Sequence, residues 1–90
     1  MIRVFVLYSA QPDQERYAQH VELSRAAAPG AIIRHGPLLG GMPEADAAYY
    51  FEYEFPDRDS WKEAQEGLMR SGEDAQQLGV EFRVYFAELS

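Results

Sequence analysis

The chain has no cysteine, which rules out disulfides, thiolate metal sites and thiol nucleophiles. It also lacks an apolar run long enough to cross a bilayer, which argues against a membrane protein. Basic residues are few: 8 Lys and Arg stand against 15 Asp and Glu, and the net charge of -7 repels nucleic acid phosphates and anionic membranes. We therefore expect neither a nucleic acid nor a membrane as a partner.

Apolar residues, in contrast, are abundant. Of the 90 residues, 47% are hydrophobic and 13% aromatic, which is too many for a disordered segment and predicts one globular domain spanning residues 1–90. A chain of this size buries only roughly two thirds of its unfolded surface, so a second copy would stabilise it. The opening MIRVFVLY is typical of a strand and lacks a signal-peptide cleavage region, so we expect a cytoplasmic protein.

Hydrophobic patterns predict strands at residues 2–8, 31–36, 48–55 and 80–89. A helix is expected from the N-cap Asp13 to Ala28, with Tyr17, His20, Val21 and Ser24 on one face. The resulting order β-α-β-β-α-β predicts an α+β, ferredoxin-like sandwich, in which both helices cover one face of a four-stranded antiparallel sheet.

The second helix is expected to begin after Asp57 or Asp59. Its predicted core side carries Trp61, Ala64, Leu68 and Met69. The stretch from Ser71 to Asp74 resembles a capping box, which predicts a restart into a short helix that Gly79 closes.

The alternation in AYYFEYEF predicts which face of the sheet the helices leave open. Tyr49, Phe51, Tyr53 and Phe55 belong to the core face, and the open face is expected to collect Arg3, Phe5, Leu7, Tyr50, Glu52, Glu54, Arg83 and Tyr85. A wet surface rarely carries so many apolar side chains, so we expect a second subunit to cover this face. Arg3 and Arg83 are predicted to neutralise Glu52 and Glu54 there.

Four segments resemble the EthD-type proteins of the dimeric α+β barrel superfamily. They are IRVFVLY, ERYAQHVELSR, EFPDRDSWKEAQ and SGEDAQQLG, and together they cover most of the chain. Tyr17, His20 and Leu23 fit the helix pattern of that family, whereas Glu22 stands where the family has proline. The resemblance implies a homodimer, with two ferredoxin-like sheets face to face around a shared cavity, and gives His20 a role there.

Each candidate for chemistry has a structural alternative. His20 is the catalytic candidate, because histidine can act as general acid or base, but it could equally be a buried helix residue. Glu52 and Glu54 could transfer protons or simply pair with the arginines. His35 is expected to be half exposed. No histidine spacing fits a metal site, and we predict neither metal nor cofactor.

The expected ligand is a small hydrophobic or aromatic compound, bound in a pocket between sheet and helices. Phe5, Tyr50 and Tyr85 suit a flat ligand, with Tyr17, Glu52, Glu54 and Arg83 as further ligand-binding candidates. The loop with Leu38, Leu39 and Met42 is predicted to fold over the pocket or onto the partner. Two functions stay open: a cofactor-independent enzyme catalysing proton-transfer chemistry such as cyclisation, dehydration or oxygenation, or a non-catalytic binding or accessory protein of a catabolic system.

Overall fold

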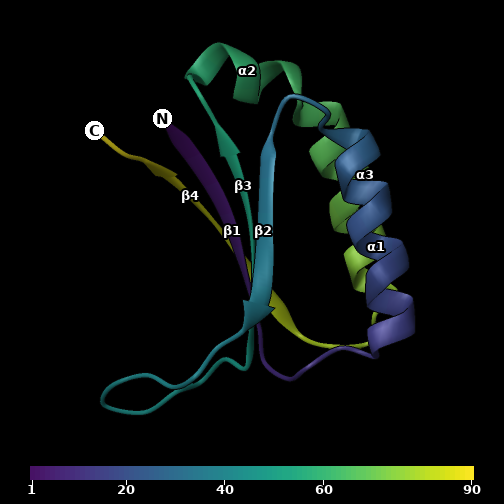
Figure 1. Ribbon diagram of the computed structural model, residues 1–90, viewed down its shortest axis with the longest axis vertical. Coiled ribbons are helices and arrows are strands. Elements are labelled where there is room, and N and C mark those ends of the chain that lie inside the picture. Colours follow the sequence, from purple (N-terminus) through teal and green to yellow (C-terminus); the bar gives the residue numbers. More distant parts are fainter.

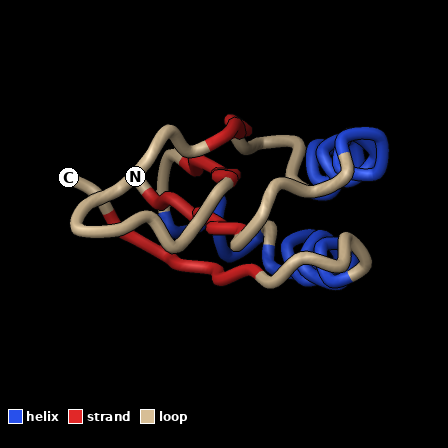
Figure 2. Tube along the Cα trace, turned by 90° about the horizontal axis from the view of Figure 1, so that it is seen from below, coloured by secondary structure: helices blue, strands red, loops and turns tan.

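The structure, a computed structural model, describes all 90 residues. Its elements are β1 (Ile2–Tyr8), α1 (Gln14–Ala27), β2 (Ile32–Pro37), β3 (Tyr49–Phe55), α2 (Arg58–Glu63), α3 (Gln65–Gln76) and β4 (Phe82–Glu88). The strands form one sheet in the order β2-β3-β1-β4, and every neighbouring pair is antiparallel. Helices α1 and α3 lie side by side against one face of this sheet (Figures 1 and 2). The predicted ferredoxin-like fold is confirmed.

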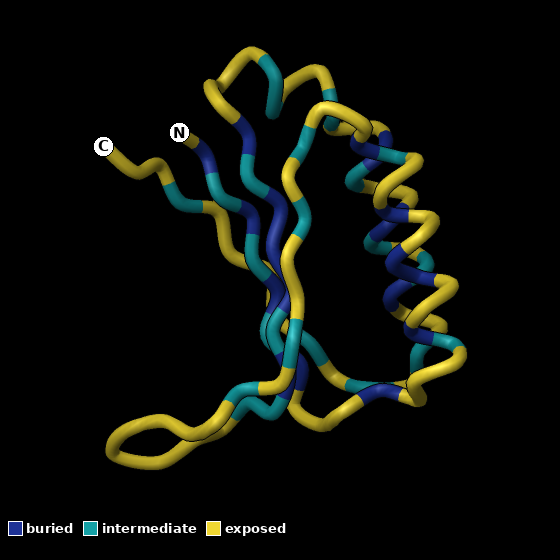
Figure 3. The backbone as a smooth tube through the Cα atoms, viewed as in Figure 1, coloured by how far each residue is buried: buried dark blue, intermediate teal, exposed yellow.

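The core lies between the sheet and the two long helices. The alternation predicted for the central strands holds: the buried side chains are Ile2, Val4, Val6 and Tyr8 on β1 and Tyr49, Phe51, Tyr53 and Phe55 on β3. In Figure 3 burial is concentrated on these two strands and on the helix surfaces that face them. Both strands are hydrogen-bonded on both sides, so their apolar residues end up deepest in the fold.

Helix α1 follows its prediction closely. The side chain of Asp13 accepts a hydrogen bond from the Arg16 backbone N–H at 3.0 Å, which satisfies one of the free amides at the helix start. The residues predicted for its inner face, Tyr17, His20, Val21 and Ser24, are all buried.

The second helical segment breaks at a different place from the one predicted. Asp57 caps α2 by accepting from the Ser60 N–H at 2.8 Å, but the chain bends at Ala64, and α3 then runs without interruption through Ser71. The predicted restart at Ser71 is wrong because the Ser71 hydroxyl bonds to Ser24 on α1 at 2.8 Å and does not cap a helix. Gly79 does close the segment, with a positive φ of 72°.

Close packing of α1 against α3 depends on Gly67. A Cβ at this position would lie 2.0 Å from the carbonyl oxygen of Ala27, a distance at which the two backbones would have to move apart. Only glycine therefore fits where the helices meet.

The end of β4 is less covered than the sequence pattern predicts. Val84 and Phe86 face the helices but are 41% and 60% exposed, and Met69, predicted for the core, is 67% exposed. These side chains border an opening between α3 and β4, as described below. Trp61 on α2 packs against Phe86, with ring centroids 5.8 Å apart.

The loop between β2 and β3 extends away from the helices, on the side of the sheet that they leave open (Figure 1). Leu39 and Met42 are fully exposed in it, so the single chain does not fold this loop over the space beneath the helices. Contact with a partner stays a prediction. No helix of the chain has the length and apolar character needed to cross a membrane.

Candidate functional site

A cavity of about 250 Å³ lies between the sheet and α3, on the helix-covered side. Eleven of its fifteen lining residues are hydrophobic. Its floor is formed by β1, β3 and β4, and its exposed rim by Met69, Val84 and Phe86. The volume is below the roughly 300–1,000 Å³ typical of sites for drug-sized ligands, so a compound of one or two rings fits best.

His20 is a polar group in the wall of this cavity. The side chain is buried, and its Nδ1 lies 2.8 Å from Oδ2 of Asp74 on α3. Arg16 also contacts Asp74, with Nη2 2.6 Å from Oδ1. The Arg16 guanidinium is the main cause that holds the pKa of Asp74 below its usual range, and the hydrogen bond from His20 adds to this effect.

This arrangement fixes the proton on the imidazole ring. An ionised carboxylate can only accept, so the Nδ1 of His20 must donate to Asp74. In the neutral ring the lone pair is then on Nε2, for which the protein supplies no partner. The Nδ1 of His20 therefore has a fixed partner, whereas its Nε2 stays available as a proton acceptor.

A group of hydroxyls lies near the same cavity. Ser71 bonds to Ser24 and to the hydroxyl of Tyr53, so these three groups satisfy one another. Tyr8 also lines the cavity, and its hydroxyl is fully buried without a hydrogen-bond partner. Burial, reinforced by Tyr53 and Asp74, raises the pKa of Tyr8 far above its usual value, so the hydroxyl stays protonated.

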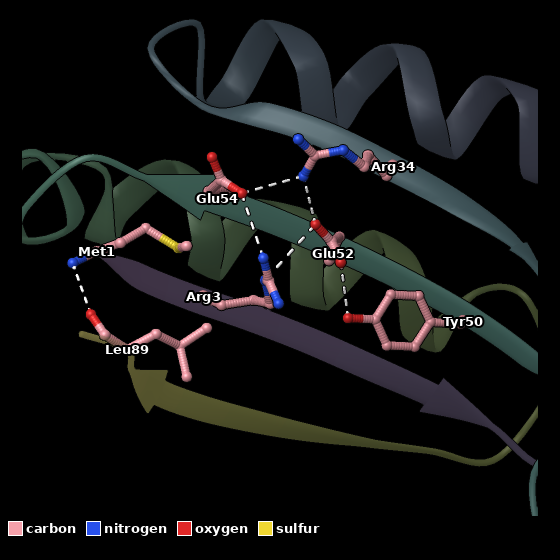
Figure 4. Close-up of polar contacts among 7 residues, drawn as sticks. All are labelled: Met1, Arg3, Arg34, Tyr50, Glu52, Glu54 and Leu89. Atoms are coloured by element: carbon pink, nitrogen blue, oxygen red, sulfur yellow. Dashed lines mark hydrogen bonds and ion pairs between the residues drawn. The ribbon is translucent and has the colours of Figure 1, made fainter.

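The opposite, open face carries an ion-pair cluster (Figure 4). Nη1 of Arg34 lies 2.7 Å from Oε2 of Glu52 and 3.1 Å from Oε1 of Glu54. Arg3 lies between the same two carboxylates, 3.6 Å from Glu52 and 3.3 Å from Glu54, and Tyr50 donates to Glu52 at 2.8 Å. Every carboxylate in this cluster is therefore matched by a guanidinium.

Arg83 is not part of this cluster, which corrects its predicted role. It is opposite Leu7 on edge strand β4, and its side chain is 71% exposed and 3.8 Å from Asp46. The counter-ion is Arg34 instead, because β2 pairs with β3 and places Arg34 directly across from Glu52. The hydrogen bond from Arg34 is the main cause that lowers the pKa of Glu54. Burial and the bond to Glu52 raise the pKa of Tyr50 to about 12.

Aromatic rings make up the rest of the open face. Phe5 stacks between Tyr50 and Tyr85, with centroid distances of 6.1 and 5.2 Å. Tyr85 is 40% exposed. The predicted membership of this face is therefore confirmed, with Arg34 as an addition.

The candidate residues thus fall on two sides of the sheet and do not form one site. His20, on α1, lies on the helix-covered side, whereas the open face carries Phe5, Tyr50, Glu52, Glu54, Arg83 and Tyr85. Tyr17 packs on His20 with centroids 6.0 Å apart but does not line the cavity. His35 is exposed on edge strand β2.

Three residues that matter here were missed from the sequence: Tyr8, Arg34 and Asp74. Tyr8 continues the alternation of Val4 and Val6, and this period of two could have placed it on the core face. Asp74 gives no such signal, because it is 54 positions from His20 and only the packing of the helices brings the two together.

Two further observations limit the choice of site. No group of three or more His, Cys, Asp or Glu side chains is arranged to hold a metal ion. A larger groove of about 670 Å³ runs along the end of the sheet near Arg83 and Asp46, but only four of its ten lining residues are hydrophobic. The smaller cavity combines an apolar wall with free polar groups, as small-molecule sites do.

Comparison with known proteins supports the fold. No family model and no curated protein matches the sequence. Among solved structures, an EthD family protein from Bacillus halodurans C-125 superposes with a TM-score of 0.73 and 21% identity, covering 100% of this chain and 99% of that chain. A hydroxynitrile lyase from Passiflora edulis gives 0.64 and 15%, covering 99% and 94%. SnoaB, a cofactor-independent oxygenase from Streptomyces nogalater, gives 0.59 and 15%, covering 99% and 92%. The predicted resemblance to EthD-type proteins is confirmed at the level of the fold.

Proposed function

We propose that the protein binds a small, largely apolar compound in the cavity between sheet and helices, and that His20 moves a proton on this compound. The observation that carries the proposal is the 2.8 Å contact between His20 Nδ1 and Asp74 at the wall of an apolar cavity. Asp74 orients the ring and would stabilise the imidazolium that forms when Nε2 takes a proton. Such orientation by a carboxylate is a recurrent device of general bases.

The names of two similar structures support a catalytic role. One is named a hydroxynitrile lyase and another a cofactor-independent oxygenase. For a hydroxynitrile, Nε2 of His20 would accept the hydroxyl proton while the carbon–cyanide bond breaks, which gives an aldehyde. The cyanide would then take the proton back from the imidazolium as hydrogen cyanide.

A non-catalytic binding protein is the second candidate, and one observation favours it. Asp74, the carboxylate that His20 contacts, is also paired with Arg16, as in a purely structural network. A binding protein needs the cavity but not a free Nε2.

Calorimetric titration with 2-naphthol tests the binding site. Gly72 lines the cavity, and a Cβ there would meet no atom within 4 Å, so Gly72→Leu should fill the cavity without a clash. We expect this variant to bind 2-naphthol at least about tenfold more weakly than the wild type. Gly40→Leu, in the exposed loop, is the matched control and should bind normally. Equal affinities in all three proteins would refute the cavity as the site.

Cleavage of mandelonitrile to benzaldehyde tests the proton-transfer step. The wild type should exceed the uncatalysed rate, and His20→Gln should lose about 10²-fold of that activity while it still binds 2-naphthol. Normal 2-naphthol binding without any cleavage would support the non-catalytic alternative.

We further propose that the open face pairs two copies of the chain into a homodimer. The support is the partly exposed stack of Phe5, Tyr50 and Tyr85, together with the loop that extends on the same side and exposes Leu39 and Met42 (Figure 1). Tyr85→Glu should shift the mass measured by light scattering from a dimer to a monomer, because it places a new carboxylate in this apolar stack. A wild-type particle of 10.2 kDa would contradict the dimer.

A further inference from the structure

Two tyrosine hydroxyls in this protein are buried without a hydrogen-bond partner, and they differ in location. Tyr8 is 0% exposed and lines the cavity, whereas Tyr17 is 2% exposed and does not. A buried hydroxyl without a partner costs free energy, and phenylalanine would fill the same space without that cost. Because Tyr8 belongs to the lining of the cavity, its unpartnered hydroxyl is a candidate for contact with a ligand.

The surroundings of Tyr8 determine which ligand atom it could contact. The two polar groups that add to its raised pKa are already engaged: Tyr53 bonds to Ser71, and Asp74 is bound by Arg16 and His20. The raised pKa of Tyr8 keeps its proton in place at neutral pH. The hydroxyl is thus a donor that has nothing to donate to within the protein.

We propose that Tyr8 donates a hydrogen bond to an acceptor oxygen of the ligand, which makes a compact aromatic ketone, aldehyde or similar neutral carbonyl compound the preferred class. This inference rests on the proposed function, because it assigns the ligand of the same cavity. A neutral carbonyl suits the site better than a carboxylate, since the charge of Asp74 lies close by and its guanidinium partner is already paired.

A pair of probes with the same shape isolates this hydrogen bond. Acetophenone has a carbonyl oxygen where α-methylstyrene has a methylene group, so the two differ in one acceptor. We expect Tyr8→Phe to weaken acetophenone binding by about 5-fold to 10-fold in a calorimetric titration and to leave α-methylstyrene unchanged. Tyr17→Phe is the control, because it removes the other unpartnered hydroxyl outside the cavity, and it should alter neither affinity.

The carbonyl carbon of labelled acetophenone gives a second measurement that needs no variant. Its NMR signal should move downfield when the wild type binds it, because a donated hydrogen bond deshields a carbonyl carbon. Equal weakening of both probes by Tyr8→Phe, no weakening of either, or an unshifted carbonyl signal would overturn the inference and leave the cavity as a binding site. If the wild type binds neither probe nor 2-naphthol, both the inference about Tyr8 and the proposed function fail.

Discussion

The two faces of this sheet differ in whether their polar side chains have partners, although the same strands supply both faces. On the open face, Glu52 is held by Arg34, Arg3 and Tyr50, so its charge is fully compensated. On the helix-covered face, Tyr8 has no partner and the Nε2 of His20 has none either. A carboxylate that is matched by guanidinium groups needs no further partner, whereas a buried polar group without a partner is one that a ligand could satisfy. The comparison therefore favours the helix-covered face for the proposed binding site.

The largest effect is expected on the helix-covered face, whose stability depends on the close approach of α1 and α3. Gly67→Ala should lower the free energy of unfolding by about 2 kcal/mol, because the new Cβ would collide with the backbone of Ala27. Gly72→Ala in the same helix meets open space and should raise it by about 0.5–1 kcal/mol through better helix propensity. Urea denaturation measures both, and equal stabilities would contradict the close packing.

The second prediction tests the ion-pair cluster on the open face. Arg34→Met should lower the urea midpoint, because Glu52 is buried and loses its nearest guanidinium. Arg83→Met should stay within about 0.5 kcal/mol of the wild type, since Arg83 is exposed and only loosely paired. Similar losses in the two variants would show that the assignment of Arg34 as counter-ion is wrong.

The smallest expected effect is on the pH dependence of stability, to which one carboxylate on each face contributes. The pKa values of Glu54 and Asp74 are both lowered in the folded protein, so both groups contribute stability above their ordinary pKa that is lost as the pH falls towards the lowered value. Wild-type stability should therefore fall between about pH 5 and about pH 2, and Glu54→Gln and Asp74→Asn should each flatten that decline. Only Asp74→Asn should also slow mandelonitrile cleavage, because it alone orients His20. Slowing by Glu54→Gln would contradict the separation of the faces.

Much of the fold follows from local patterns that the sequence displays openly. The alternation in AYYFEYEF places Tyr53 in the core and Glu52 opposite, and Asp13 marks the start of α1. The break at Ala64 has no such signal, because alanine favours helix and the bend occurs against local propensity.

The candidate site was less predictable, since its parts come together only in three dimensions. His20 could be singled out by its residue type, but its partner Asp74 lies on another helix. The role given to Arg83 was wrong because alternation shows which face a residue occupies but not how far along the sheet it lies. Strand order and register decide that position: β4 pairs with β1 and places Arg83 opposite Leu7, whereas β2 pairs with β3 and places Arg34 across from Glu52.

The single tryptophan gives this protein its own optical reporter. Trp61 packs on Phe86, and Phe86 belongs to the exposed rim of the cavity. A compound that enters between α3 and β4 should therefore change the fluorescence emission of the indole. The six tyrosines can add to this emission by energy transfer to the indole. Occupancy can be followed in the unmodified chain, without a label and without knowledge of the natural ligand.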